Sequence, residues 1–176
     1  MDSRTRDERT EAGVTVRLAT TDDLDSVLDQ WLALVDDQHR HGTRLDGRRL
    51  PAREQLATAI VRNGVLVAAT PNEDGEIVGF VTFGTERHAF EPRRTRGRIR
   101  MLYVEPDHRD RGIGGRLLET AHTLLLDRNC ETVFVDVLVD NERARQFYRD
   151  HDFSPHRLTM ERRPEVETNT NPSTEE

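Results

Sequence analysis

The clearest chemical potential in the sequence lies in one turn, Arg109-Asp110-Arg111-Gly112-Ile113-Gly114-Gly115. Glycine has no Cβ, so the backbone of such a turn can approach a ligand closely. Where a helix begins at the turn, its first N–H groups and the positive end of its dipole form a site for a phosphate or pyrophosphate. Taken alone, the pattern also fits a merely tight connection from a strand to a helix.

Two familiar phosphate-binding motifs do not match this turn. The lysine that follows the glycines of an ATP-binding P-loop is missing, and Gly112-x-Gly114 lacks the third glycine of a dinucleotide fingerprint. The turn therefore indicates an anion site of another kind, and its neighbours must specify which.

The elements that position this turn are a strand and an amphipathic helix. The apolar run 98–104 predicts the strand, and Pro106 ends its pairing. The run 115–128 predicts the helix, because its leucines and Ala121 recur on one side with helical spacing.

Hydrophobic periodicity and turn residues predict the remaining elements. Val65–Thr70 and Ile77–Phe83 form an antiparallel hairpin across a loop that contains Pro71 and Gly75. The run 132–139 is almost uninterrupted and apolar, as expected for a strand covered on both faces. The other predicted elements are a strand over 14–18, a helix capped by Thr20 or Thr21, a helix opened by Pro51 and ended by Gly64, a short helix over 141–150 and a closing strand pair over 153–162.

Two sequence blocks then make the turn specific. Leu102-Tyr103-Val104-Glu105-Pro106 leads into Arg109-x-x-Gly112-x-Gly114, and Asn141-x-x-Ala144-x-x-Phe147-Tyr148 follows one helix and one strand later, ahead of Phe153. This constellation resembles the GNAT superfamily of N-acetyltransferases, in element order over roughly residues 14 to 162 and in motif detail over 98 to 153. Asp152 departs from the family pattern, which commonly has glycine there.

The resemblance implies an α+β fold with a mixed, mostly antiparallel central sheet, helices on both faces and the order β-α-α-β-β-β-α-β-α-β. It also implies acetyl-CoA as co-substrate. The fourth strand would splay from the fifth, and backbone groups of Leu102, Tyr103 and Val104 would pair with the pantetheine arm. The pyrophosphate would lie on the turn formed by Arg109, Asp110, Arg111, Gly112, Ile113, Gly114 and Gly115.

The resemblance also assigns roles to three side chains. Tyr148 matches the family tyrosine that donates a proton to the CoA sulfur, although it could instead be a core aromatic beside Phe147. Asn141 either caps the short helix or binds the pantetheine amide, and both roles are compatible. Asp136 stands where the branch that acetylates protein N-termini often has a glutamate, which makes it a candidate base or substrate anchor.

Asp136 has a second interpretation. A charge within the apolar run 133–138 is costly to bury unless it is paired or functional, so an ion pair with Arg98 or Arg100 is the alternative. Glu86, His88 and Glu105 are fallback bases.

Composition limits the other function classes. The chain has 176 residues with 26 basic and 33 acidic side chains, a net charge of −7, and every basic residue is arginine. The acidic balance argues against general nucleic-acid binding and favours solubility, so we expect Arg93, Arg94, Arg96, Arg98 and Arg100 to pair with the chain's own carboxylates. The acid excess and the absence of lysine suggest adaptation to a salt-rich cytosol.

We expect a cytoplasmic protein, with no membrane partner, because neither a spanning run nor a secretory signal is visible. The single cysteine, Cys130, excludes an internal disulfide, and His39-x-His41 in a polar loop is a weak metal signal. We therefore predict no metal.

The expected organisation is one domain over 14–162 between disordered tails, 1–13 and 163–176. The expected function is transfer of an acetyl group from acetyl-CoA to a primary amine of a small molecule or peptide, by direct transfer in a ternary complex. The alternative is a non-catalytic acyl-CoA-binding sensor or interaction module. The acceptor is not readable from the segments expected to shape it, 31–50 and the loop near Phe90, and a homodimer is possible for the fold.

Overall fold

The computed structural model of the chain describes residues 13–39, 49–71, 75–88 and 91–160. Apart from Gly13, the two predicted tails lie outside the described residues. The elements are β1 (Thr15–Leu18), α1 (Leu24–His39), α2 (Arg49–Val61), β2 (Val65–Ala69), β3 (Ile77–His88), β4 (Glu91–Val104), α3 (Ile113–Asp127), β5 (Thr132–Val135) and α4 (Glu142–Arg149), with short 3-10 turns at Thr21–Asp23 and Pro106–His108.

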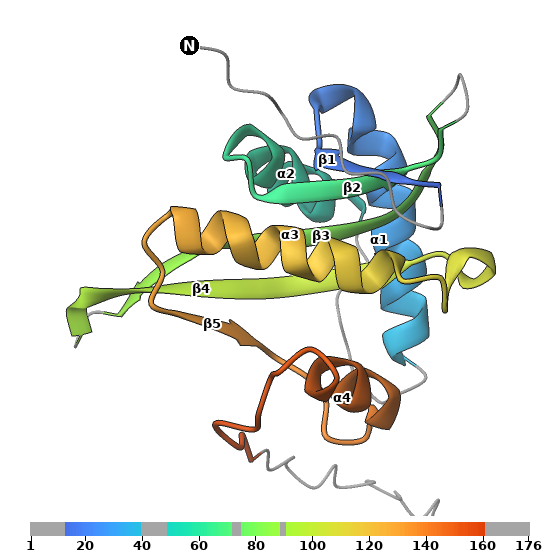
Figure 1. The fold of residues 1–176 in the computed structure, drawn as a ribbon. Coiled ribbons are helices and arrows are strands. Elements are labelled where there is room, and N and C mark those ends of the chain that lie inside the picture. The colour runs from blue at the N-terminus through green and yellow to red at the C-terminus, as the bar shows by residue number, and fades with distance from the viewer. Residues whose placement is uncertain (1–12, 40–48, 72–74, 89–90, 161–176) are drawn as a thin grey trace, which may run out of the picture.

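The five strands form one sheet in the order β1-β2-β3-β4-β5 (Figure 1). The first four strands pair antiparallel, and β4 and β5 pair parallel. Helix α3 lies on one face of the sheet, and α1 and α2 lie on the other. The predicted fold class, a mostly antiparallel sheet with helices on both faces, is confirmed.

The sheet is covered on both faces because its strands contribute apolar side chains to two separate cores. In β2, Val65, Val67 and Ala69 pack with α1 and α2, whereas Leu66 and Ala68 pack with α3. This alternation follows from the period of two residues in a strand. The leucines of α3 fall on its buried side, with Leu117, Leu118 and Leu125 fully buried.

A bulge in β4 marks the point where the site opens. Thr82 of β3 pairs with Met101, but Phe83 pairs with Ile99, so Arg100 is an extra residue in the ladder. Ile99 faces the α3 core, while Met101 faces the α1 core, because the bulge reverses the facing of the strand. The pairing of β4 with β5 ends at the same place, at Ile99 and Val135.

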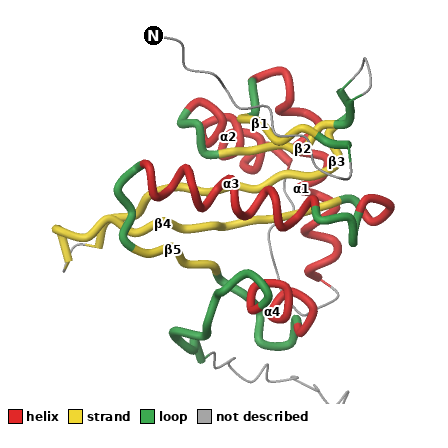
Figure 2. Tube along the Cα trace, viewed as in Figure 1, coloured by secondary structure: helices red, strands yellow, loops and turns green. Residues whose placement is uncertain are grey.

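Beyond that pair the two strands separate, and β5 leads away toward α4 (Figure 2). The resulting fork leaves the last part of β4, Met101 to Val104, unpaired on its β5 side. The expected splay of the two strands is therefore present.

Four sequence predictions about elements need correction. The arginines before residue 98 belong to β4 and not to a preceding loop. Strand β5 ends at Val135 instead of Val139, and its side chains are only partly buried because it is the edge strand. Residues 153–160 contain no strand, so the described part of the closing strand pair is absent. The α2 and α3 helices begin two residues earlier than predicted, at Arg49 and Ile113.

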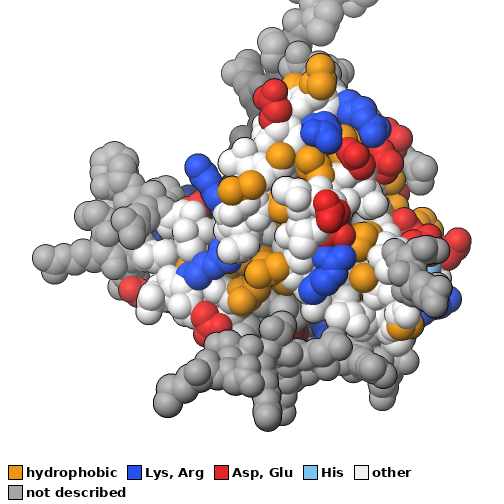
Figure 3. Space-filling model, turned by 90° about the horizontal axis from the view of Figure 1, so that it is seen from above, with side chains coloured by type: hydrophobic (Ala, Val, Ile, Leu, Met, Phe, Trp, Pro, Cys, Tyr) orange, Lys and Arg blue, Asp and Glu red, His pale blue; other side chains and the backbone are white. Residues whose placement is uncertain are grey.

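The surface seen from above in Figure 3 carries acidic and basic side chains beside one another, with hydrophobic side chains scattered between them. Several arginines form ion pairs with carboxylates of the same chain, among them Arg17 with Asp23, Arg49 with Asp29 and Arg53 with Asp25. No helix among the described residues has both the length and the apolar character needed to cross a bilayer.

Candidate functional site

The glycine turn adopts the conformation that an anion site requires. Gly112 is the N-cap of α3 with a φ of 77°, in the left-handed region that favours glycine. Its carbonyl accepts a hydrogen bond from Arg116 N at 3.1 Å, which starts the helix. The N–H groups of the first helical turn have no partner within a helix, so those of Ile113, Gly114 and Gly115 are available to a ligand. Ile113 itself is buried in the α3 core and anchors the helix start.

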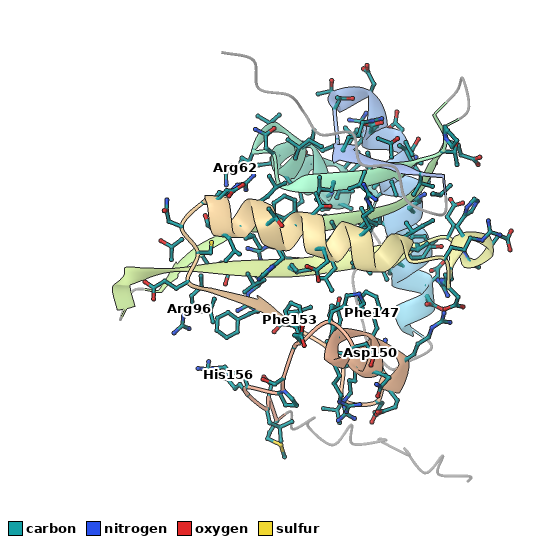
Figure 4. The ribbon with its side chains drawn as sticks, in the orientation of Figure 1. Arg62, Arg96, Phe147, Asp150, Phe153 and His156 are labelled. Carbon is teal, nitrogen blue, oxygen red and sulfur yellow. The ribbon has the colours of Figure 1, made fainter. Side chains whose placement is uncertain are left out.

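Gly114 and Gly115 also let α4 pack closely against the start of α3. A Cβ on Gly114 would lie 3.5 Å from the ring of Phe147, and a Cβ on Gly115 would lie 2.6 Å from His151 Nε2. Phe147 and Phe153 occupy the space between α4 and the sheet (Figure 4). A Cβ at Gly115 would therefore require the His151 ring to shift, whereas a Cβ at Gly114 would make an ordinary contact with Phe147.

The charged residues of the turn have defined partners. Arg109 Nε donates to the carbonyl oxygen of Val104 at 2.8 Å, and its guanidinium lies over the ring of Tyr103. Asp110, at a φ of 60°, pairs with Arg143 of α4 at 3.1 Å. Arg111 is exposed. Arg109 therefore ties the turn to the end of β4, while Arg111 and Arg143 bring positive charge to its exposed side.

The open edge of β4 supplies the second part of the site. Glu105 N donates to Val78 O in β3 at 3.0 Å. Since successive residues of a strand direct their backbone groups to alternate edges, Tyr103 faces β3, and Leu102 and Val104 face the fork. The Val104 carbonyl is held by Arg109, which leaves the Leu102 N–H and C=O and the Val104 N–H at the open edge.

Tyr103 therefore differs from its two neighbours. Its backbone faces β3, and its side chain is buried in the core formed with α1 and α2. Burial raises the pKa of the Tyr103 phenol. The backbone of Tyr103 is therefore not at the open edge of β4, and the Arg109 guanidinium lies over its ring.

Helix α4 places Asn141 and Tyr148 on the far side of the fork. Asn141 Oδ1 accepts a hydrogen bond from Ala144 N at 3.0 Å, so the predicted capping role is observed. Tyr148 packs edge-on against Phe147 and Phe153, in the same apolar cluster as Leu102 and Val135. Burial raises the pKa of Tyr148 to about 12, so the phenol keeps its proton throughout the neutral range.

Asp136 is not a buried charge. It follows β5 directly, and 83% of its side chain is exposed. Its Oδ2 accepts a hydrogen bond from Arg98 Nη1 at 2.6 Å, which is the ion pair offered as the alternative interpretation. The burial argument for a functional Asp136 is therefore wrong, although the residue stands at the fork itself, next to the last pair of β4 and β5.

Arg98 joins Asp136 to a second carboxylate, Glu86 of β3. Arg98 Nε donates to Glu86 Oε2 and Arg100 Nη2 donates to Glu86 Oε1, each at 2.8 Å. Burial acts to raise the pKa of Glu86, but the two guanidinium groups outweigh it and hold that pKa below its ordinary value. Glu86 is consequently charged and doubly paired, which makes it a weaker base than an unpaired carboxylate.

The remaining candidates are less closely associated with the fork. Glu105 lies on the α1 side and accepts a hydrogen bond from Gln30. The side chains of His88 and His39 and the whole of His41 and Phe90 lie outside the described residues. Within the described ranges, no group of three or more His, Cys, Asp or Glu side chains is arranged to hold a metal ion.

Sequence reasoning missed two residues beside the turn. His151 Nδ1 hydrogen-bonds to Phe147 O at 2.8 Å, and its ring reaches Gly115. Arg143 reaches Asp110 across the start of the fork. His151 lies just beyond the end of α4 at Arg149, yet its ring centroid is 4.5 Å from that of Phe147. The i, i+4 spacing of the two aromatic residues was the available signal. Nothing in the sequence indicated that α4 packs on the start of α3.

Comparison with known proteins explains why the fork and the turn occur together. The Acetyltransferase (GNAT) family matches residues 28–153, which is most of the chain. The chain belongs to the GNAT family. Members of this family normally use acetyl-CoA and act on amine-bearing acceptors.

Two curated GNAT relatives match part of the chain. An uncharacterized N-acetyltransferase of Archaeoglobus fulgidus is 40% identical over 91 residues, covering 52% of this chain and 60% of its own length. A thialysine N-epsilon-acetyltransferase of Bos taurus is 30% identical over 87 residues, covering 48% of this chain and 51% of its own length. The chain thus spans between half and three fifths of the length of these relatives.

Solved structures agree on the GNAT fold. A mutant of a Bacillus halodurans protein superposes with a TM-score of 0.72 at 20% identity, covering 86% of this chain and 99% of that one. An aminoglycoside acetyltransferase from an uncultured soil metagenomic sample gives a TM-score of 0.65 at 17% identity, covering 89% and 98%. At such identities the similarity establishes the fold alone.

Proposed function

We propose that this GNAT chain transfers an acetyl group from acetyl-CoA to a primary amine, by direct transfer while both substrates are bound. The observation that carries the proposal is the unpaired edge of β4 from Met101 to Val104, which leads straight to the free N–H groups at the start of α3. A strand edge and a helix start in line provide backbone donors for an extended amide-containing arm and for a pyrophosphate.

The residues present fit acetyl-CoA. Leu102 and Val104 offer backbone groups to its pantetheine arm, and Gly112, Gly114 and Gly115 keep the turn clear of side chains. Arg111 and Arg143 add positive charge near the phosphates. When bound, acetyl-CoA supplies the thioester whose acetyl group is transferred. Much of the rate enhancement then comes from holding two reactants in one geometry.

Tyr148 is the proposed proton donor to the departing sulfur. Its phenol remains protonated at neutral pH because burial raises its pKa, and it packs in the same cluster as Leu102 beside the fork. A proton held at the phenol oxygen lowers the barrier to departure of a thiolate. Asp136, exposed and negatively charged at the mouth of the fork, is the proposed anchor for the acceptor's ammonium group and the recipient of its proton.

The direct test measures thiol release from acetyl-CoA by the full chain with a panel of antibiotics, polyamines, amino acids and N-terminal peptides. Binding of acetyl-CoA is measured separately by calorimetry. We expect saturable binding and acceptor-dependent thiol release with at least one class. Binding without turnover across the whole panel would instead favour the acyl-CoA sensor, and absence of binding would overturn both.

A further inference from the structure

A continuous network of charged side chains lies beside the fork. Its members follow one another in the order Asp136, Arg98, Glu86, Arg100. The contact between Asp136 and Arg98 is 2.6 Å long, and each of the other two contacts is 2.8 Å long. The network therefore has a carboxylate at one end and a guanidinium at the other, and in the described part of the chain no ion pair joins these two ends directly.

The network lies on the face of the sheet opposite α3. A Cβ on Gly97 would contact Leu125 of α3. Since successive residues of a strand point to opposite faces, the Arg98 side chain points away from α3. Tyr148 and Leu102, in contrast, pack against the core on the α3 side. A molecule that binds to the network thus approaches Asp136 from the face opposite α3.

Both ends of the network are accessible to a ligand. The exposed fraction is 83% for the Asp136 side chain and 50% for the Arg100 side chain. Among the described residues, Asp136 is bound only through Oδ2 and Arg100 only through Nη2. Asp136 therefore keeps a carboxylate oxygen that can accept hydrogen bonds, and Arg100 keeps further N–H donors.

The charges of the network favour a ligand that carries both signs. Glu86 is paired with both guanidinium groups, so these three side chains together keep one positive charge, which Asp136 balances from the Arg98 end. An ammonium group bound to Asp136 competes with Arg98 for that carboxylate. The positive charge of the arginines is then best balanced by an anionic group at Arg100.

The spacing of the two ends limits the length of such a ligand. With contacts of about 2.8 Å, roughly 6 to 10 Å separates the Asp136 carboxylate from the Arg100 guanidinium, because one guanidinium and one carboxylate lie between them. A ligand that bonds to both ends uses about 3 Å of this span at each contact. Its cationic and anionic groups are then only a few bonds apart, as in a short amino acid.

We propose that the acceptor is a short amino acid, with its ammonium group at Asp136 and its carboxylate at Arg100. This inference rests on the proposed transfer function, in which Asp136 anchors the acceptor, and it deepens that function by naming the class of acceptor. Arg100 is then the residue that selects amines with a carboxylate over other amines, and Glu86 positions its guanidinium.

The test is calorimetric titration of the full chain at pH 7 with glycine, β-alanine and γ-aminobutyrate, and with the amide of each. CoA is present in place of acetyl-CoA, so that no transfer occurs. Each amide keeps the amine and loses the anionic charge. We expect at least one acid to bind about tenfold more tightly than its amide. Arg100→Gln should remove this difference by weakening the binding of the acid, and the Kd of the amide should stay unchanged.

The matched control is Arg53→Gln on α2. The Arg53 side chain is 47% exposed and pairs with the carboxylate of Asp25, much as Arg100 pairs with Glu86. This variant should keep the wild-type preference for the acid. Melting curves show whether each variant is folded, and the comparison of acid and amide in the wild type needs no variant.

Three results would overturn the proposal. These are equal affinity for acid and amide in all three pairs, no saturable heat with any acid up to about 10 mM, and equal loss of the preference in Arg53→Gln. Because the readout is binding, it is separate from turnover. An acid that binds through Arg100 without thiol release from acetyl-CoA would refute the proposed transfer and keep the amino-acid site, whereas thiol release without a preference that depends on Arg100 would do the reverse.

Discussion

Individual side chains at the fork have environments that suit different tasks. The Tyr148 ring contacts the rings of Phe147 and Phe153, and its phenol keeps its proton at neutral pH, whereas 83% of the Asp136 side chain is exposed. The proposed proton donor thus comes from α4, and the proposed proton acceptor comes from the end of β5. Two predictions belong to this scale.

Tyr148→Phe removes the proposed proton donor and keeps the ring packing. We expect kcat to fall by about a hundredfold or more, with the KM for acetyl-CoA nearly unchanged. Because the phenol ionises only near pH 12, its deprotonation should cause no loss of wild-type activity between pH 6 and about pH 10. Phe153→Leu, a neighbouring packing change, is the control. A variant with wild-type kcat would leave Tyr148 a purely structural residue.

Asp136→Asn removes the charge at the mouth of the fork. We expect kcat/KM for the acceptor amine to fall by more than tenfold, with a change in the acidic limb of its pH profile. Stability should change little, because the ion pair with Arg98 has an exposed carboxylate partner. Glu142→Gln, also exposed and also paired with arginine, is the control. A smaller loss with an unmoved pH profile would exclude Asp136 as base or anchor.

At the scale of elements, two junctions hold helices against the sheet. One is the glycine turn between β4 and α3, and the other is the connection from β1 to α1. In the second, Asp23 accepts hydrogen bonds from Arg17 and from Thr20 N, the latter at 2.7 Å, and holds the start of α1 against the end of β1.

Gly112→Ala places a side chain at a φ of 77°, where nothing lies within 4 Å of the added Cβ. The strain is therefore conformational, about 1 to 2 kcal/mol. The free turn relaxes away from this φ and must be forced back when a ligand binds, so the Kd of acetyl-CoA should rise about tenfold. The control is Gly84→Ala, where the added Cβ also has nothing within 4 Å and where φ is not positive. Calorimetry should show an unchanged Kd of acetyl-CoA for this variant. Equal affinities in the two variants would contradict the role of the turn.

Asp23→Asn weakens a half-buried ion pair, since only 8% of Asp23 is exposed but 39% of the Arg17 side chain is exposed. We expect a loss of about 2 to 3 kcal/mol in the free energy of unfolding in urea. Asp25→Asn removes an exposed pair between the first turn of α1 and Arg53 of α2, and this variant should lose less than about 1 kcal/mol.

The hydrogen bonds from Arg17, outweighing burial, hold the pKa of Asp23 below its ordinary value. A lowered pKa in the folded state stabilises the protein above the unfolded value near 4, and this contribution is lost as the pH falls below it. In strong acid, the free energy of unfolding of the wild type should therefore no longer exceed that of Asp23→Asn. A constant difference in stability from pH 7 to about pH 2 would contradict this.

At the scale of the whole molecule, the net charge and its screening by salt affect the stability of the folded chain. The chain carries a net charge of −7 without any lysine, and many of its arginines are paired with its own carboxylates. Repulsion among the excess carboxylates destabilises the compact state. Salt weakens this repulsion, because the Debye length falls from about 10 Å at 0.1 M to about 3 Å at 1 M.

We therefore expect Tm to rise between low salt and molar KCl, by about 2 to 4 °C for each kcal/mol regained. The same titration at pH 5.5, the isoelectric point, is the control, and the gain should be much smaller there. A Tm that does not change with KCl at pH 7 would remove the argument for adaptation to salt.

Short-range patterns in the sequence determined the local elements and the chemistry of the turn. The glycines of 112–115 predict an anion site because only glycine removes the Cβ, and the apolar period of α3 defines its buried face. The two motif blocks, taken together, predicted the family, which is confirmed, and acetyl-CoA as the co-substrate that this family normally uses. Each turn, each helical pattern and each separate motif block is contained within a short stretch of neighbouring residues.

Only the tertiary structure decided which groups meet. The bulge at Arg100, the end of β4–β5 pairing at Val135 and the contact of His151 with Gly115 depend on strands and helices far apart in the chain. The tertiary structure also decided the exposure of Asp136. An apolar run has the same local pattern in a central strand and in an edge strand, so the sequence does not distinguish the two.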